Sequence, residues 1–93
     1  MRLKNRKGFI TMTTRFGLVL KAARQKAKVT QSHLAKSLGY ESSQFISNVE
    51  RGLVFLPNSK IIKAASVVDV PVKKLADAKV WDFKQKVFEA VGL

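Results

Sequence analysis

Cysteine is absent from this sequence of 93 residues. Disulfide scaffolds, zinc fingers, iron–sulfur clusters and thiol nucleophiles are therefore excluded together. Long apolar runs are absent as well, because none approaches the roughly 20 residues that a helix needs to cross a bilayer. The basic segment at residues 1–12 also lacks the apolar core of about 7–15 residues that marks a secretion signal. These absences predict a cytoplasmic protein that does not enter a membrane.

Catalytic signatures are missing too. The sequence has no phosphate-binding loop, dinucleotide fingerprint, nucleophile elbow or HExxH zinc motif. His33 is the only histidine, and without a cysteine or a second histidine we expect it to be an exposed polar residue rather than a metal ligand. The acidic residues are too scattered for paired acid–base chemistry: Glu41, Glu50, Asp69, Asp77, Asp82 and Glu89. We therefore expect no enzymatic activity, no cofactor and no metal site.

Negative charge is scarce. The chain has 18 Lys and Arg residues against 6 Asp and Glu residues, which gives a formal net charge of +12. The imbalance is concentrated in residues 1–40, where ten basic side chains occur and no acidic one. A surface of one sign favours a polyanion such as nucleic acid as the partner.

What remains is a short chain with helical periodicity. A chain of this length forms one small domain with a modest core. Apolar residues recur at the spacing of helices, and no alternating strand pattern is present. We therefore expect an all-α fold with five helices, at about 15–26, 31–38, 43–51, 58–68 and from 71 onward. A separate C-terminal helix is expected in residues 79–93.

The pattern of residues 30–52 indicates two short helices joined by a tight turn. Thr30 can cap the first of them with its hydroxyl group. Gly39 and Gly52 can end the two helices, because glycine adopts the left-handed conformation that a helix C-terminus commonly needs. The outward face of the second helix carries hydrogen-bonding side chains that are uncharged apart from the last: Ser43, Gln44, Ser47, Asn48 and Arg51. Such a face indicates a polar partner.

Residues in this stretch also share a spaced pattern, which consists of Thr30-Gln31, Leu34-Ala35, Leu38-Gly39, Ile46-Ser47 and Glu50-Arg51-Gly52. The pattern resembles the helix-turn-helix domain of the Xre/Cro family of phage and bacterial repressors, over roughly residues 16–75. The resemblance implies a five-helix repressor-like DNA-binding domain at residues 14–78. It also implies that the helix around residues 43–51 enters the major groove of DNA.

The residue types fit this role. Gln44 and Asn48 are four residues apart, so they share one face of a helix, and their amides can pair with the edges of adenine bases. With the resemblance, the residues expected to read bases are Ser43, Gln44, Ser47 and Asn48. The residues expected to contact the DNA backbone are Gln31, Ser32, Lys36 and Arg51.

The resemblance implies two further details. The family pattern pairs Arg24, in the first helix, with Glu50, which closes the recognition helix. The alternative is that Arg24 contacts solvent or phosphate. The turn between the two short helices is one residue longer than the commonest family version, so Ser43 or Ser47 stays an alternative to Gln44 as a base-reading residue.

The two ends of the chain carry the remaining expectations. Residues 1–13 contain four basic side chains without helical periodicity. They form either an arm that lies on DNA or a loose tail, and Met12 is an alternative start. Residues 79–93 carry more large apolar side chains than a small core can cover. Four of these side chains form either a dimerisation surface or a cap on the monomer's own core: Trp81, Phe83, Val87 and Phe88.

Three functions are compatible with these observations. The first, which we expect, is a sequence-specific regulator of transcription that binds double-stranded DNA, a repressor of phage or bacterial type acting as a homodimer. The second is an antitoxin or accessory protein that binds a protein partner through residues 53–93 and uses DNA binding for autoregulation. The third is non-specific binding of nucleic acid by charge alone, against which the uncharged Gln44 and Asn48 argue.

Overall fold

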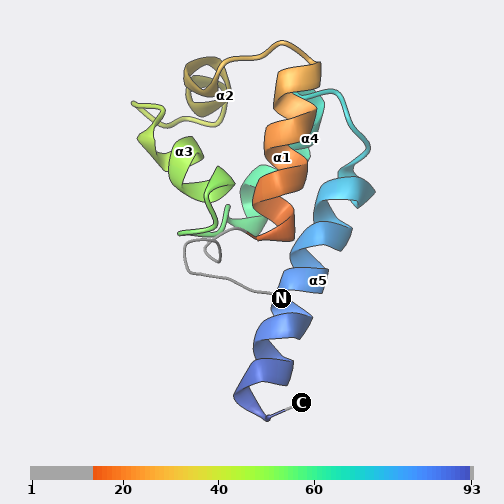
Figure 1. The fold of residues 1–93 in the computed structure, drawn as a ribbon. Helices are drawn as coiled ribbons and strands as arrows, with labels where there is room; N and C mark the ends of the chain where they lie inside the picture. Colours follow the sequence, from red (N-terminus) through yellow and green to blue (C-terminus); the bar gives the residue numbers. More distant parts are fainter. Residues whose placement is uncertain (1–13, 93) are drawn as a thin grey trace, which may run out of the picture.

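The computed structural model describes residues 14–92, so the expected arm at residues 1–13 lies outside the described part of the chain. Within the described residues all regular secondary structure is helical, which confirms the all-α expectation. The elements are α1 (Arg15–Lys26), α2 (Gln31–Ser37), α3 (Gln44–Glu50), the 3-10 turn η2 (Asn58–Lys60), α4 (Ile61–Val67) and α5 (Val72–Ala90) (Figure 1).

One hydrophobic core lies between the helices. α1 contacts α3 on one side and α5 on the other (Figure 1). Phe16 and Leu20 of α1 and Leu34 of α2 are fully buried. The other large side chains that are fully buried are Ile46, Val49, Leu56, Val68 and Leu75. Burying a side chain of this size contributes about 1.5–3 kcal/mol relative to leaving it exposed, so one core holds all five helices together.

Threonine hydroxyls cap the N-termini of the first two helices. The Oγ1 atom of Thr14 accepts a hydrogen bond of 2.9 Å from the amide of Gly17, and the Oγ1 atom of Thr30 accepts one of 2.9 Å from the amide of His33. Each bond satisfies a first-turn N–H group that has no partner inside its helix. The capping role expected of Thr30 is thus confirmed.

Glycines end α2 and α3. Gly39 has a φ angle of 90° and Gly52 one of 81°, both in the left-handed region. After α2, the amide of Tyr40 donates to the carbonyl of Ala35 at 2.9 Å, and the turn after α3 is closed by the equivalent bond. These bonds satisfy carbonyl groups at the helix ends. The expected ends of both short helices are therefore confirmed.

The segment between α3 and η2 covers the core with a single side chain. Leu56 is fully buried, whereas Leu53, Val54 and Phe55 are exposed. Only Leu56 of this apolar segment therefore packs on the core. The three exposed side chains leave an apolar surface beside the end of α3.

α5 is one continuous helix of 19 residues, which corrects the expected division into a fifth helix and a separate C-terminal helix. No glycine or proline interrupts residues 72–90, and the buried positions Leu75, Ala78 and Asp82 continue along one face. The C-terminal half of the helix projects past the other described elements (Figure 1). Although α5 is the longest described helix, neither it nor another described helix is apolar over enough length to cross a membrane.

A carboxylate of α5 caps the start of α1. Asp82 is only 6% exposed, and it accepts hydrogen bonds from the amides of Arg15 at 2.9 Å and Phe16 at 2.8 Å. Negative charge at this position also interacts favourably with the positive end of the helix dipole. The guanidinium of Arg15 lies over the ring of Trp81, 4.1 Å from its centroid. These contacts fix the direction of α5 relative to α1.

Candidate nucleic-acid interface

α2 and α3 lie together beside α1, joined by residues 38–43 (Figure 1). Leu34 and Ala35 of α2 are buried, as are Ile46 and Val49 of α3. The opposite sides of both helices therefore face solvent. This is the helix-turn-helix arrangement that the sequence predicts, and it leaves one side of α3 uncovered.

A buried ion pair braces α3 against α1. The Nε and Nη2 atoms of Arg24 donate to the carboxylate of Glu50 at 2.7 and 3.1 Å, so the two groups meet through parallel bonds. Their side chains are 11% and 2% exposed. The Nη1 atom of Arg24 also donates to the carbonyl of Val29 at 2.9 Å. Arg24 is therefore engaged inside the protein and is not free for solvent or phosphate.

Gln31 completes the same network. Its Nε2 atom donates to the carboxylate of Glu50 at 2.9 Å, so this carboxylate receives hydrogen bonds from both α1 and α2. A buried charge with such partners is stable, but removing one partner typically costs about 3–5 kcal/mol because the other charge is stranded. The network therefore fixes the position of α3 against the two preceding helices.

α1 approaches α3 closely at Gly17. A Cβ atom at this position would lie 2.7 Å from the carbonyl oxygens of Val49 and Glu50. Any larger residue would force the two helices apart, because these oxygens belong to backbone that cannot rotate away. The last turn of α3 therefore rests directly on the backbone of α1.

The outward face of α3 carries the side chains expected to read bases. Gln44 is exposed, and Ser43, Ser47 and Asn48 are half-buried. The Nε2 atom of Gln44 donates to the Oδ1 atom of Asn48 at 2.9 Å. The pair then presents the Gln44 carbonyl oxygen as an acceptor beside the Asn48 amide nitrogen as a donor.

The start of α3 leaves a second polar group available. Ser43 is the N-cap residue, but its hydroxyl makes no capping bond. Instead, the Oγ atom of Ser42 accepts a hydrogen bond of 3.3 Å from the amide of Gln44. The hydroxyl of Ser43 is therefore free of the capping task and lies next to the Gln44–Asn48 pair in the sequence.

The residues expected at the DNA backbone fall into two groups. Ser32, Lys36 and Arg51 are exposed on α2 and at the end of α3. Gln31 is half-buried, and one hydrogen of its amide is used by Glu50. Its second amide hydrogen is left for an outside acceptor. Gln31 therefore has a structural role that the sequence did not predict.

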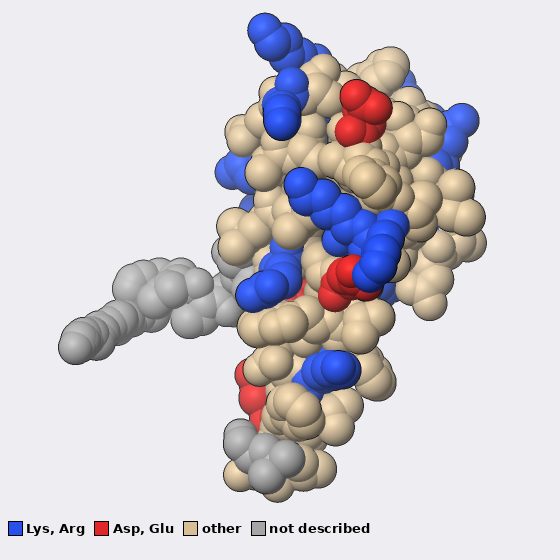
Figure 2. Space-filling model, turned by 90° about the vertical axis from the view of Figure 1, so that its right-hand side faces the viewer, with Lys and Arg blue, Asp and Glu red and all other residues tan. Residues whose placement is uncertain are grey.

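Most basic side chains in the described residues have no acidic partner. The ion pairs formed within residues 14–92 are Arg24–Glu50 and the exposed pair Lys73–Asp77. Figure 2 shows Lys and Arg side chains spread over one face, with few acidic groups between them. Positive charge that is not neutralised internally raises the attraction of the protein for a polyanion.

The residues expected at a dimer surface are exposed on α5. Phe83 exposes 67% of its surface, and Trp81, Val87 and Phe88 expose 42% each, so none of them caps the core. They lie on two sides of the helix, because successive residues are about 100° apart. Phe83 lines a groove beside α4, whereas Trp81 lies against Arg15 of α1.

Two residues that position this interface were not predicted from the sequence. Gly17 carried a signal, because a glycine inside a helical pattern often marks the close approach of another backbone. Asp82 carried none, because the amides that it caps belong to Arg15 and Phe16, which lie 67 and 66 residues away in the chain.

Comparison with known proteins finds a match among solved structures. No protein-family model matches the chain, and no curated protein matches it at a significant level. Among solved structures, the chain is similar to the crystal structure of the restriction-modification controller protein C.AhdI from Aeromonas hydrophila. The TM-score is 0.60 at 27% sequence identity, and the match covers 67% of this chain and 92% of that chain. The likeness supports a repressor-like helix-turn-helix fold of the regulator type for this chain.

Proposed function

We propose that this protein is a sequence-specific transcriptional regulator of the repressor type found in phages and bacteria, and that it reads double-stranded DNA with α3. The observation that carries the proposal is the Gln44–Asn48 pair, two uncharged amides bonded to each other on the open side of a braced helix. The strongly basic composition supports a polyanionic partner. The similar fold of a restriction-modification controller supports a regulatory role, which the protein would exert in the cytoplasm.

The amide pair suits readout in the major groove. An adenine presents a donor and an acceptor there, and a Gln or Asn amide can bond both at once. Because Gln44 is the first residue of α3, it lies at the end of a recognition helix that typically contacts base edges. Asn48 follows one turn later and extends the contact along the groove. The bond between the two side chains reduces their freedom before DNA arrives.

The neighbouring residues suit contacts with phosphate. Lys36 and Arg51 are exposed cations that can neutralise phosphate groups, and Ser32 can donate a hydrogen bond to one. The second amide hydrogen of Gln31 can do the same. Such contacts set the position of the protein on the duplex without reading its sequence, so α3 would be held in register by α2.

Ser43 and Ser47 remain the alternative readers. Both are half-buried, and their hydroxyls can bond several base edges. A shift of the protein along the groove by one residue would bring them into the place that we give to Gln44 and Asn48. Substitution of each of the four residues separates the two registers.

We further propose that the regulator is a homodimer. Phe83 and Val87, with Trp81 and Phe88, give the projecting part of α5 an apolar character that suits contact with another protein surface. Two-fold symmetry would place two copies of α3 in successive major grooves, with half-sites about 10–10.5 base pairs apart.

A second candidate function is that of an antitoxin or accessory protein. Its support is the exposed apolar surface of Leu53, Val54 and Phe55, which belongs to the region 53–93 expected to bind a protein partner. In that case DNA binding would serve autoregulation, and affinity for the operator would depend on the partner. A regulator that acts alone should reach its full operator affinity as the purified chain.

Selection of bound duplexes from a random DNA pool tests the proposal. We expect enrichment of one short sequence, present as two half-sites, and clearly weaker binding of random duplexes at the same salt concentration. Equal affinity for the selected and the random DNA would leave only attraction by charge, and the proposal would be wrong.

A further inference from the structure

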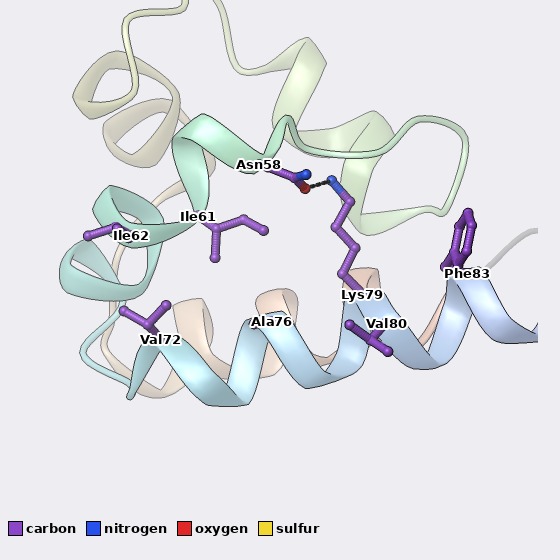
Figure 3. A pocket seen from close by; sticks show the side chains of 8 residues that line it. All are labelled: Asn58, Ile61, Ile62, Val72, Ala76, Lys79, Val80 and Phe83. Carbon is purple, nitrogen blue, oxygen red and sulfur yellow. Dashed lines mark hydrogen bonds between the residues drawn. The ribbon is translucent and has the colours of Figure 1, made fainter.

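A groove runs between α4 and the first half of α5. It has a volume of about 460 Å³ and largely apolar walls (Figure 3). α4 contributes Ile61 and Ile62, and α5 contributes Val72, Ala76 and Val80, while Asn58 and Lys79 add a polar edge. Ile62 exposes 70% of its surface and Val80 53%. A contiguous apolar surface that is open to solvent in this way marks a contact site.

The second half of α5 has the opposite shape, a ridge without a core behind it. Phe83, Val87 and Val91 expose 67%, 42% and 64% of their surfaces. The helix projects past the other elements there, and the end of the projection is mostly uncharged on the face in Figure 2. Apolar side chains on such a ridge gain stability only when another surface covers them.

The groove and the ridge belong to one stripe of α5. Its residues recur at steps of three or four, as one face of a helix requires: Val72, Ala76, Val80, Phe83, Val87 and Val91. At 1.5 Å per residue the stripe is about 28 Å long. Each molecule therefore carries a groove at one end of the stripe and a ridge at the other, and Phe83 lies where the two meet, because it also lines the groove.

We infer that a second copy of this chain occupies the groove, with the two α5 helices packed antiparallel so that the ridge of each copy fills the groove of the other. The inference rests on the proposed function for the expectation of a homodimer, and it adds the direction and register of the helices. The contacts on each side of the two-fold axis are Phe83 of the second copy on Val80, Val87 of the second copy on Ala76, and Val91 of the second copy on Val72.

This register is self-complementary. A two-fold axis between residues 81 and 82 makes every contact occur twice, as an interface between identical copies requires. The larger side chain meets a smaller one at two levels, Phe83 at Val80 and Val87 at Ala76, which lets the helices interdigitate. Figure 3 shows Val80 and Val72 at the groove on α5, with Ile62 of α4 across from Val72.

The charges on one flank of the stripe favour the antiparallel direction, whereas the other flank brings Lys79 near Lys86 of the second copy. Asp77 and Lys84 flank the stripe on the same side, and the antiparallel register brings Asp77 next to Lys84 of the second copy, twice by symmetry. Asp77 bonds Lys73 at 2.7 Å within the chain, but both side chains are more than half exposed, so this pair exchanges easily.

A parallel arrangement fits less well. It would place residues of the same number at the same level, so it would leave the groove at the first half of α5 without a ridge to fill it. Lys79 does not distinguish the two arrangements, because its Nζ atom is engaged within its own chain, where it donates to the carbonyl of Leu56 and to the Oδ1 atom of Asn58, at 2.6 Å each (Figure 3).

The register also divides the residues first expected at the dimer surface. Phe83 and Val87 lie in the stripe and contact the second copy. Trp81 and Phe88 are seven residues apart on another side of the helix, and Trp81 is already covered in part by Arg15. The dimer contact is thus assigned to Phe83 and Val87 and not to Trp81 and Phe88.

Cross-linking tests the direction and the register, because the chain has no cysteine of its own. The double variant Ala76→Cys/Val87→Cys should form a covalent dimer on mild oxidation. The two positions are about 16 Å apart along one helix, so a bond within one chain is impossible. Each single variant alone should stay monomeric on a non-reducing gel, and a mixture of the two should cross-link. The matched control is Lys74→Cys/Gln85→Cys, which has the same spacing on the other side of α5.

Two results would overturn the inference. Efficient cross-linking of Ala76→Cys to itself would mean a parallel pair, and cross-linking of the double variant no better than the control would mean that the stripe is not the contact. Binding of selected and random DNA by the same variants separates this inference from the proposed function. If the variants fail to cross-link but still prefer the selected DNA, only the proposed register is wrong. If they cross-link but show no preference for the selected DNA, only the proposed function is wrong.

Exchange of charges gives an independent test of the register. Asp77→Lys and Lys84→Asp should each weaken self-association by roughly three- to tenfold, because two exposed ion pairs become like-charged contacts. The double variant Asp77→Lys/Lys84→Asp should recover most of this loss. The pair with Lys73 is not restored in the double variant, so recovery can come only from the contact between copies. Additive weakening in the double variant would contradict the register.

Discussion

The helix-turn-helix end and the projecting half of α5 differ in the kind of partner surface that their exposed side chains suit. At the helix-turn-helix end the buried carboxylate of Glu50 has its partners inside the protein, and the exposed Gln44 and the half-buried Asn48 offer uncharged donors and acceptors. On the projecting half of α5, Phe83 and Val87 are apolar and open to solvent. The first surface suits a partner with polar edges, and the second suits an apolar surface that excludes water.

The same difference predicts how each region can be broken. The braced end depends on a closed set of buried hydrogen bonds, so it should be most sensitive to the loss of one partner. The α5 stripe depends mainly on apolar contact, so it should tolerate small changes of shape but not a buried charge. A change at one end should leave the chemistry of the other intact.

The largest effect is expected from Arg24→Ala. This change removes the partner of a carboxylate whose side chain is 2% exposed, so the free energy of unfolding should fall by about 3–5 kcal/mol. Chemical denaturation followed by circular dichroism measures the loss. The control is Lys73→Ala, which removes an exposed ion pair and should change stability by less than about 1 kcal/mol. Similar losses for the two variants would mean that Glu50 is not held as described.

Phe83→Asp should break the other region without unfolding the monomer. Phe83 is 67% exposed in the single chain, so the fold should keep its helical spectrum. Self-association should weaken by roughly 100-fold, because two carboxylates per dimer would enter an apolar groove. Sedimentation measures the change, and Phe88→Asp on the other side of α5 is the control. Equal weakening by the two variants would argue against the stripe as the contact.

Gly17→Ala should displace α3 from the side that packs on α1. The added methyl group would collide with the carbonyl oxygens of Val49 and Glu50, so we expect a loss of about 1–3 kcal/mol in spite of the better helix propensity of alanine. DNA binding should weaken with it, because α3 would shift. Ser66→Ala, at an exposed position of α4, should change neither property. Unchanged stability of Gly17→Ala would mean that α1 and α3 are less closely packed than described.

The smallest effect is expected from Lys36→Ala. Lys36 is exposed on α2, so its loss should leave the fold unchanged and remove one phosphate contact. Affinity for selected and random DNA should fall alike, and the slope of log affinity against log salt should decrease by about one. A fall limited to the selected DNA would instead make Lys36 a base-reading residue.

The all-α class and the ends of the short helices could be predicted because their signals are local. Thr30 and Gly39 act within one turn of the residues that they cap or release. The continuity of α5 could not be predicted in the same way. The expected boundary near residue 78 rested on a change in apolar pattern, whereas Asp82 continues the buried face by bonding to the start of α1.

In the candidate site, too, local features could be predicted and contacts between distant elements could not. The exposed positions of Gln44 and Lys36 follow from helical periodicity, so the sequence was sufficient for them. The bond from Gln31 to Glu50 and the contact of Gly17 with α3 join elements that are separate in the chain. Such contacts depend on how the helices cross, and a single sequence carries no direct record of that geometry.

The central claim is that α3 reads bases with Gln44 and Asn48. The most direct measurement is the ratio of affinities for selected and random DNA, for the four variants in which each candidate reader is replaced by alanine. Gln44→Ala and Asn48→Ala should each lower this ratio, by an amount that corresponds to about 1–3 kcal/mol of discrimination between the two DNAs. Ser43→Ala and Ser47→Ala should change the ratio little. A ratio that falls only in the two serine variants would move the register by one residue. A ratio unchanged in all four variants would contradict the claim that α3 is the reading helix.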